Sequence, residues 1–318
     1  MTIQETKRWM RGPVVAVATP FHDDFSLDLD ALSENVEFMI THGVTMGQGV
    51  LLVGGAGGEH PVMNIHERKQ VLKTAVDAAR GRVPVMTSVQ HTDTRVMVEL
   101  TRYAADVGCA AVQVSAVYYY EPNEYDTYRL FELISRSTDI PIMIYNTWWD
   151  GLHLKPPMLE RLAQIDHVVA LKWSAPTYWE YTDGLAAMAG KLAVVDNDLN
   201  RIWSHLLGAT GFVTHISNFW PEYSLEIFQL LERRDYVGAK EKEAAFKWDW
   251  MRFRGEALKT TGGEGPFIKA AMIAAGLRAG PPRPPAAPIS DQAIANLREM
   301  FKSKGIPLAR PDYSPARI

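Results

Sequence analysis

The feature that most constrains the fold is an alternation of short β-rich runs with longer amphipathic stretches, repeated eight times between residue 13 and about residue 235. Each β-rich run is apolar and rich in β-branched residues, which is typical of strands buried on both faces of a parallel sheet. Strands are predicted at 14–18, 49–53, 84–89, 111–115, 141–146, 168–173, 192–195 and 211–216. Helices are predicted after them at 29–42, 65–79, 94–107, 125–136, 157–164, 178–188, 200–207 and 221–231.

Eight consecutive β-then-α units predict an α/β fold of the (β/α)8 TIM-barrel class. A doubly wound open sheet is the alternative, but the glycine signature of dinucleotide-binding sheets does not follow the first strand. Several ends of the predicted helices carry residues that commonly cap helices. Asp93 and Asn123 precede helices as N-caps, and Gly43, Gly108 and Gly190 are placed as C-terminal stops.

The pattern changes after about residue 236, where no further strand is predicted and helical patterns continue at 236–254, 266–275 and 290–304. The proline-rich stretch 280–285 must be an extended connector, because proline removes backbone N–H donors and clashes inside a helix. We therefore expect a barrel over residues 1–235, a C-terminal helical segment over 236–308 and a tail over 309–318.

Charge and composition exclude several classes of protein. The 33 basic and 37 acidic residues are spread along the 318-residue chain, so no nucleic-acid partner and no polybasic membrane patch is expected. Cys109 is the single cysteine, which excludes a disulfide framework and a cysteine-based metal site. The first eleven residues are polar and charged, and no apolar run reaches the length of a membrane span. A soluble, cytoplasmic protein is expected.

One lysine stands out, because Lys172 lies in the run 168–174 that otherwise reads as a buried strand. Desolvation lowers the pKa of a lysine, and a neutral amine near pH 7 is a nucleophile towards carbonyl groups. The alternative is a lysine at a strand end that points to solvent. Tyr145 ends the neighbouring predicted strand, and adjacent strands lie about 4.8 Å apart. The phenol and the amine can therefore approach closely, as the proton transfers of imine chemistry require.

A glycine-rich turn at 54–59 follows the second predicted strand. It lacks the Lys-Ser/Thr continuation of a nucleotide-binding loop. Successive backbone N–H groups in such a turn can form an anion-binding nest for a substrate carboxylate, and a plain tight turn is the alternative. His66 and His91 with Glu59 match no common metal-ligand spacing, so no metal site is expected.

Together these residues resemble the dihydrodipicolinate synthase / N-acetylneuraminate lyase family of class I, pyruvate-type Schiff-base aldolases. The resemblance extends from about residue 12 to about residue 307. The segments that carry it are Ala-Thr-Pro-Phe at 18–21, Gly-Ala-Gly-Gly-Glu at 55–59, Ile-Tyr-Asn at 144–146, Leu-Lys at 171–172, the stretch 208–221 and the C-terminal segments 269–271, 276–277 and 283–284.

The resemblance implies a Schiff base between Lys172 and the carbonyl group of a small 2-oxo acid, with Tyr145 moving protons at the imine and at the bond that forms or breaks. It implies that the backbone of Ala56, Gly57 and Gly58 holds the substrate carboxylate. No cofactor is implied, because the protonated lysine imine is itself the electron sink.

Further site residues follow from the same resemblance and from the loops at the strand ends. The substrate-binding set is completed by Thr19, Val213, Trp148, Trp173 and Asn218. Tyr119 matches a tyrosine that reaches into a neighbouring subunit's site in many members, and it counts as a third catalytic residue. A homo-oligomer, either a dimer or a tetramer, is therefore expected.

Two departures from the family pattern distinguish this chain. The turn usually carries hydroxyl side chains where this sequence has Ala56 and Gly57. After the tyrosine strand, synthase members also place a proline and then an arginine that grips a second carboxylate. This chain has Thr-Trp-Trp-Asp-Gly at 147–151, without an arginine, and Asp150 would repel an anion. On these grounds the sequence predicts a member of the family other than dihydrodipicolinate synthase itself.

The predicted activity is aldol cleavage or condensation of a 2-oxo acid. Many aromatic residues lie near predicted strand ends, and they suit a flat or apolar aldehyde as in the family's hydratase-aldolases. They are Tyr118, Tyr119, Tyr120, Trp148, Trp149, Trp173 and Trp220. Packing of these rings between helices or subunits is the alternative explanation. A dehydratase or deaminase acting on a 2-oxo sugar acid, and a non-catalytic binding or regulatory descendant, stay open as alternatives.

Overall fold

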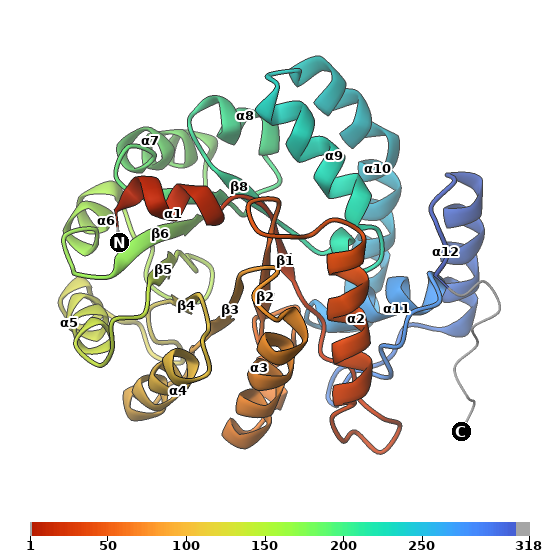
Figure 1. Cartoon of the computed structure of the whole chain (residues 1–318), viewed down its shortest axis with the longest axis horizontal. Helices are drawn as coiled ribbons and strands as arrows, with labels where there is room; N and C mark the ends of the chain where they lie inside the picture. The colour runs from red at the N-terminus through yellow and green to blue at the C-terminus, as the bar shows by residue number, and fades with distance from the viewer. Residues whose placement is uncertain (1, 310–318) are drawn as a thin grey trace. The chain divides into compact units, whose positions relative to one another are not determined.

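The computed structural model of the protein describes residues 2–309, so the predicted tail from residue 310 onward lies outside the described residues. Eight parallel strands pair in chain order round a closed barrel, which confirms the predicted (β/α)8 architecture (Figure 1). The strands are β1 (Gly12–Ala16), β2 (Val50–Val53), β3 (Val85–Ser88), β4 (Ala111–Val114), β5 (Ile142–Tyr145), β6 (Val168–Trp173), β7 (Ala193–Asp196) and β8 (Gly211–Thr214).

A helix follows each strand, within a few residues of the predicted bounds. These helices are α2 (Leu29–Thr41), α3 (Ile65–Ala79), α4 (Thr94–Asp106), α5 (Glu124–Ser135), α6 (Pro156–Leu162), α7 (Tyr178–Met188), α8 (Arg201–Leu206) and α9 (Pro221–Glu232). The predicted caps at Asp93 and Asn123 are confirmed, because their side chains accept hydrogen bonds from the N–H groups of Arg95 and Asp126.

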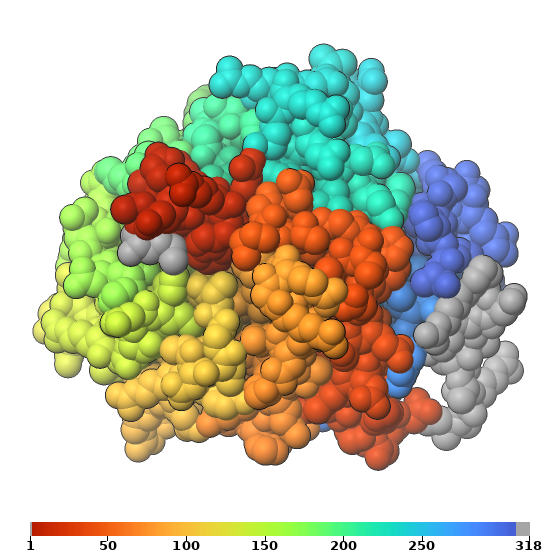
Figure 2. Space-filling model, in the orientation of Figure 1, coloured from red at the N-terminus to blue at the C-terminus, as the bar shows by residue number. Residues whose placement is uncertain are grey.

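The N-terminal part of the chain differs from the prediction. The first strand begins at Gly12 instead of residue 14, and it is preceded by an unpredicted helix, α1 (Ile3–Trp9). A capping box between Thr2 and Glu5 starts α1. Lys7 fixes it by donating a hydrogen bond to the Ala189 carbonyl at 2.6 Å. Figure 2 shows α1, in dark red, on the surface beside the green part of the chain.

Three further helices follow the barrel, namely α10 (Tyr236–Thr260), α11 (Gly265–Ala274) and α12 (Asp291–Ser303). An aromatic cluster joins them, since Phe219 stacks on Phe301 of α12 at 5.2 Å between ring centroids and contacts Trp250 of α10 at 5.3 Å. None of the helices within residues 2–309 is both long enough and apolar enough to cross a membrane.

Contacts divide the described residues into two compact units. The first unit comprises residues 2–14, 45–52 and 81–213, and the second comprises 15–44, 53–80 and 214–309. In the first unit, helices α4 to α8 lie outside strands β3 to β8 (Figure 1). The division of the chain near residues 235 and 308 that the sequence suggested stays a prediction.

Trp173 shows how the layers of the first unit pack. It is fully buried at the end of β6, and its indole N–H donates to the Tyr181 carbonyl of α7 at 2.9 Å. A Cβ atom built on Gly184 of α7 would lie 2.1 Å from Cζ2 of this ring. Glycine at position 184 is therefore required by the close approach of α7 to the indole.

We expect the Gly184→Ala variant to be destabilised by about 2 kcal/mol or more, because the added methyl group overpacks a filled interior. Alanine is the better helix former by about 1 kcal/mol, so any loss arises from the clash. Gly255→Ala in α10 is the matched control, because nothing lies within 4 Å of its Cβ position. It should raise stability by about 0.5–1 kcal/mol. Urea denaturation measures the free energy of unfolding of both variants. A Gly184→Ala variant as stable as wild type would contradict this packing.

Candidate active site

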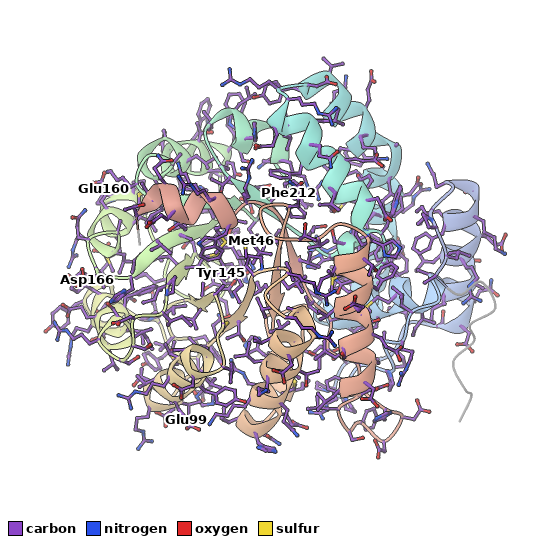
Figure 3. The ribbon with its side chains drawn as sticks, viewed as in Figure 1. Met46, Glu99, Tyr145, Glu160, Asp166 and Phe212 are labelled. Atoms are coloured by element: carbon purple, nitrogen blue, oxygen red, sulfur yellow. The ribbon has the colours of Figure 1, made fainter. Side chains whose placement is uncertain are left out.

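A buried lysine and a buried tyrosine lie side by side at the ends of β5 and β6. Tyr145 pairs in register with Lys172, and the two residues are 7% and 6% exposed. The Lys172 Nζ atom lies 3.9 Å from the centroid of the Tyr145 ring. Figure 3 labels Tyr145 within the ring of strands, whereas Glu99 and Glu160 lie at the outer rim. The amine thus occupies a largely apolar position at the carboxyl end of the barrel strands, where enzymes of this fold carry their chemistry.

The two strand ends are locked together beyond this pair. Asn146 is fully buried and donates from its side chain to the Ser174 carbonyl at 2.8 Å. The Ser174 hydroxyl donates back to the Asn146 carbonyl at 3.1 Å. The Asn146 side-chain oxygen also accepts the Leu154 N–H at 2.9 Å, which anchors the loop after β5. These bonds hold the ends of β5 and β6, and with them Tyr145 and Lys172, at a fixed separation.

Two tryptophans of the loop after β5 adjoin the tyrosine. Trp149 contacts the Tyr145 ring edge-on at 5.9 Å between centroids, and Trp148 contacts Trp149 at 5.6 Å. Both indoles are partly exposed, at 36% for Trp148 and 52% for Trp149. The predicted site residue Trp148 therefore packs on Trp149, and Trp149 packs on Tyr145. The sequence named Trp149 among the aromatic residues near strand ends but not in the substrate-binding set.

Trp173 lies on the other side of β6 from Lys172, because successive side chains of a strand point to opposite faces. Its ring packs against α7 and is therefore not available to a substrate at the Lys172 side of the strand. The same outer layer holds Asp196, which pairs in register with Trp173 and accepts a hydrogen bond from the Tyr181 hydroxyl at 2.5 Å. Burial raises the pKa of Asp196 above its usual range.

Asp198 follows this strand end. Its carboxylate accepts the Ala175 N–H at 3.0 Å and its own N–H donates to Asp196. Burial, and secondarily the charge of Asp196, raise the pKa of Asp198 from 3.8 to about 6. The folded protein therefore binds more protons than the unfolded chain between about pH 4 and pH 6, so this group makes stability fall as the pH rises through that window.

We expect Asp198→Asn to stabilise the fold by about 1–2 kcal/mol at pH 7.5. Two pKa units correspond to about 3 kcal/mol, which partial exposure to solvent reduces. The gain should shrink at pH 4.5, because the wild-type carboxyl group is then largely protonated. Urea denaturation at the two pH values measures it. Asp106→Asn, at an exposed position, is the control and should change stability by no more than about 0.5 kcal/mol; a pH-independent gain at position 198 would contradict the assignment.

The glycine-rich turn belongs to the second unit. The Gly58 N–H donates to the Gly55 carbonyl at 3.1 Å, and the Glu59 N–H donates to the Ala56 carbonyl at 3.0 Å. Among residues 2–309, no protein acceptor takes the N–H groups of Ala56 and Gly57. The predicted nest of three amides therefore has two amides left for a ligand. The sequence could not show this difference, since it depends on how the turn closes.

Thr19 and Asn218 support the backbone of the second unit. Thr19 is buried, and its hydroxyl donates to the Gly58 carbonyl at 2.8 Å. Both amide hydrogens of the Asn218 side chain are used, on the carbonyl groups of Ala16 and His215, and its oxygen accepts the Ala18 N–H. These bonds hold the turn and the end of β1 in place.

The other residues that the sequence singled out take no part in the hydrogen bonds of Thr19 and Asn218. Val213 is buried in β8 at 9% exposure. Tyr119 is 96% exposed in the loop after β4 and has a positive φ of 86°. His66 is exposed and His91 accepts the Asp93 N–H, and within the described part of the chain no three His, Cys, Asp or Glu side chains gather as a metal site would require.

Comparison with known proteins gives a consistent result. The sequence model of the Dihydrodipicolinate synthetase family matches residues 10–304. A 4-hydroxy-tetrahydrodipicolinate synthase of Methanothrix thermoacetophila is 33% identical, over 92% of this chain and 96% of its own length. A protein of the same name from Methanospirillum hungatei is 30% identical, over 91% of this chain and 98% of its own.

Solved structures agree with these relatives. Dihydrodipicolinate synthase from Aquifex aeolicus superposes with a TM-score of 0.82 at 26% identity, covering 94% of this chain and 100% of that chain. The chloride-inhibited enzyme from Acinetobacter baumannii, solved with pyruvate, gives a TM-score of 0.83 at 26% identity, covering 93% and 99%.

The prediction that this chain is a family member other than dihydrodipicolinate synthase is wrong, because the comparisons do not support that exclusion. The relatives that match over more than nine-tenths of the chain carry that activity in their names. The missing hydroxyl groups at Ala56 and Gly57 and the absence of an arginine from the segment 147–151 therefore do not exclude that activity. The free N–H groups of the turn show one physical reason, because a carboxylate can be bound by backbone donors alone.

The match to the family model covers all eight strands, among them β6 with Lys172, and the C-terminal helices. Enzymes of this kind are class I aldolase-type lyases, which form a carbon–carbon bond through an imine between a lysine and pyruvate and use no external cofactor. Lys172 is buried beside Tyr145 and does not point to solvent, which agrees with a lyase. The protein is thus an enzyme, and the chain belongs to the dihydrodipicolinate synthetase family.

Proposed function

We propose that the protein binds pyruvate as an imine on Lys172 and joins the derived enamine to an aldehyde, with Tyr145 as the acid/base. The observation that carries the proposal is the buried, register-paired contact of the amine with the Tyr145 ring at 3.9 Å. Burial disfavours the charged form of a lysine, and the neutral amine is the nucleophile that imine formation needs.

The steps balance with these two residues. The Lys172 amine adds to the pyruvate carbonyl carbon, and water leaves as the imine forms. Loss of one methyl proton gives the enamine, whose carbon attacks the aldehyde carbon while the aldehyde oxygen takes up a proton. Water then hydrolyses the imine and releases the product. Tyr145 would carry the protons in the dehydration and hydrolysis steps. A positioned acid/base typically raises the rate of such proton-transfer steps about 10²–10⁴-fold.

The proposal extends to the pyruvate carboxylate, which the N–H groups of Ala56 and Gly57 would bind. Within the described part of the chain these two N–H groups have no protein acceptor, which supports this role. Thr19 would act indirectly, through its hydrogen bond to the Gly58 carbonyl, and Val213 would contribute an apolar side chain. Each hydrogen bond to a charged carboxylate is worth about 1.5–3 kcal/mol, so two amides together contribute about 3–6 kcal/mol to holding it.

Two acceptors are candidates. The partly exposed rings of Trp148 and Trp149 beside Tyr145 favour a flat, apolar aldehyde. The second candidate is the reaction for which the curated relatives are named, the synthesis of 4-hydroxy-tetrahydrodipicolinate.

Borohydride reduction of the protein with pyruvate, followed by intact mass and peptide mapping, tests the first step. One reduced pyruvate adduct on Lys172 is expected, and its absence at saturating pyruvate would overturn the proposal. A panel of aldehydes with pyruvate, analysed by NMR of the products, then separates an aryl aldehyde acceptor from the reaction of the named relatives. The same spectra would reveal dehydration or deamination of an added 2-oxo sugar acid.

A homo-oligomer is part of the proposal, supported by the almost complete exposure of Tyr119 in the single chain. A solved relative at 25% identity is described as a monomeric dihydrodipicolinate synthase variant, so assembly is not uniform among similar proteins. Light scattering of the purified protein measures the state, and a monomer would remove Tyr119 from the catalytic set. A cytoplasmic location stays a prediction from composition.

A further inference from the structure

A buried ion pair adjoins the glycine-rich turn in the second unit. The Lys269 Nζ atom lies 2.6 Å from Glu59 Oε1, and the two side chains are 1% and 8% exposed. The same Nζ atom donates to the Pro281 carbonyl at 2.9 Å. A buried cation and a buried carboxylate must each satisfy the other, because an unpaired charge in the interior is strongly unfavourable. The pair therefore fixes Glu59, the last residue of the turn, against α11.

Arg283 strengthens the attachment from the connector after α11. Its backbone N–H donates to Glu59 Oε2 at 3.3 Å, and its guanidinium binds the Val62 carbonyl and the Glu67 carboxylate. The Phe21 ring lies close to both cations, with its centroid 4.0 Å from Lys269 Nζ and 4.3 Å from Arg283 Cζ. One cluster thus ties the turn, the loop after β1 and the C-terminal segment together.

The backbone of the turn needs such a constraint. Glu59 adopts a left-handed conformation, with φ 57° and ψ 34°, which is unfavourable for a residue with a side chain. A Cβ atom on Gly57 would lie 3.0 Å from Ile268 Cδ1, and one on Gly58 would lie 2.9 Å from the Val17 carbonyl oxygen. The turn is therefore confined between the end of β1 and the residue preceding Lys269.

We infer that the Glu59–Lys269 pair, supported by Arg283, is a positioning device that holds the turn 54–59 in the shape that leaves the Ala56 and Gly57 N–H groups for a carboxylate. The inference rests on the proposed function for the identity of that carboxylate as pyruvate. In this role Glu59 and Lys269 position the turn and need no contact with the substrate. Because the turn has no side-chain hydroxyl group at positions 56 and 57, its affinity for a carboxylate depends on backbone shape and hence on this pair.

Lys269 is charged under the conditions of the test. Burial lowers the pKa of Lys269 to about 8, while the neighbouring Glu59 carboxylate acts in the opposite direction and Arg283 adds to the lowering. At pH 7 most molecules therefore carry the ion pair, and measurements are made there.

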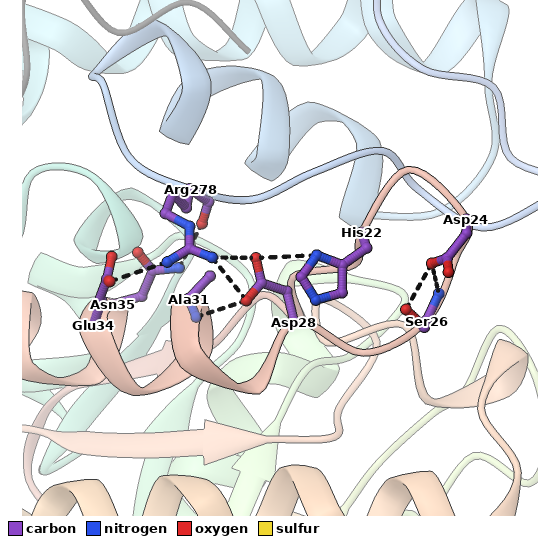
Figure 4. A network of polar contacts seen from close by, with 8 residues as sticks. All are labelled: His22, Asp24, Ser26, Asp28, Ala31, Glu34, Asn35 and Arg278. Carbon is purple, nitrogen blue, oxygen red and sulfur yellow. Dashed lines mark hydrogen bonds and ion pairs between the residues drawn. The ribbon is translucent and has the colours of Figure 1, made fainter. Parts of the chain in front are cut away.

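The test compares Lys269→Met with Arg278→Met in the full-length protein at pH 7. Arg278 is a matched control, because it is a cation of the same C-terminal segment that pairs with Asp28 at 2.7 Å and Glu34 at 3.0 Å instead of the turn (Figure 4). Two readouts are taken. One is the hydrogen-exchange rate of the peptide spanning residues 54–59 without substrate, and the other is the pyruvate concentration that gives half-maximal borohydride trapping on Lys172.

We expect Lys269→Met to speed exchange in the turn at least tenfold and to raise the half-saturating pyruvate concentration at least tenfold, with trapping complete at saturation. Arg278→Met should leave both within about twofold. Unchanged values in Lys269→Met, or equal shifts in Arg278→Met, would overturn the inference. If wild-type protein traps no pyruvate, the proposed function fails and the exchange rates alone decide the inference. Should Lys269→Met not fold, Arg283→Lys replaces it, with a shift of at least threefold expected in the same direction.

Discussion

Lys172→Ala is expected to abolish the borohydride-trapped pyruvate adduct and to lower the rate of carbon–carbon bond formation by at least about 10⁴-fold, the scale seen when a covalent nucleophile is removed. The loss is this large because the imine is both the covalent attachment and the electron sink of the reaction. Without the amine, the methyl group of pyruvate has no acidified C–H bond and the enamine does not form.

No other described lysine is placed to replace it. Lys269 is the other buried lysine, but its amine is held by the Glu59 carboxylate and the Pro281 carbonyl. Lys269→Met is therefore the matched control, since it removes a second buried amine and should still give the full adduct on Lys172 at saturating pyruvate. Intact mass after reduction reads out both variants, and thermal denaturation verifies that each is folded. An adduct that persists in Lys172→Ala would assign the nucleophile to another residue.

The barrel could be predicted because its signal is local and repeated. Each strand is an apolar run and each helix an amphipathic one, so eight units are visible without knowledge of any long-range contact. Helix α1 escaped prediction because seven residues are too few to display a period, although the Thr2–Glu5 capping box was present in the sequence. The register of the strands, in contrast, appears only in the folded sheet.

The positions of the candidate site residues could be predicted where the alternation of side chains along a strand applied. Lys172 and Tyr145 were found from their places at adjacent strand ends, and the register pairs them. The same rule should have removed Trp173 from the substrate-binding set, because the residue after an inward-facing lysine must face the helices. Thr19 and Asn218 were expected at the substrate, but hydrogen bonds to backbone groups distant in sequence hold their side chains.

Lys269 entered the sequence analysis only as part of the family segment 269–271 and was not identified as a buried amine, although its sequence signal was the same as that of Lys172. It lies in the run Pro-Phe-Ile-Lys-Ala-Ala-Met-Ile-Ala-Ala, where every other side chain is apolar. A lysine in such a run is buried and must find a partner. What differs is the partner, a carboxylate for Lys269 and an aromatic ring for Lys172. Sequence identifies both as buried amines, and only the fold separates the ion-paired one from the one beside a phenol.

Tyr145→Phe is expected to lower kcat by about 10²–10⁴-fold while leaving the pyruvate adduct on Lys172 trappable. Phenylalanine keeps the ring under the Lys172 amine at 3.9 Å and the edge contact with Trp149, so the position of the nucleophile is preserved. Only the hydroxyl group is lost, and with it the group that moves protons as the carbinolamine dehydrates and the imine hydrolyses.

The signature that distinguishes acid/base catalysis from structural support is therefore a slower approach to the same final extent of trapping, with kcat reduced far more than the half-saturating pyruvate concentration is raised. Tyr223→Phe is the matched control, because it also removes a buried hydroxyl group, which donates to the Glu243 carbonyl at 2.9 Å in the second unit. It should cost about 1 kcal/mol of stability and keep kcat within about threefold. If Tyr145→Phe retained more than a tenth of wild-type kcat, the proton would have to travel through another group, and Tyr145 would serve only as the apolar surface that keeps the Lys172 amine out of water.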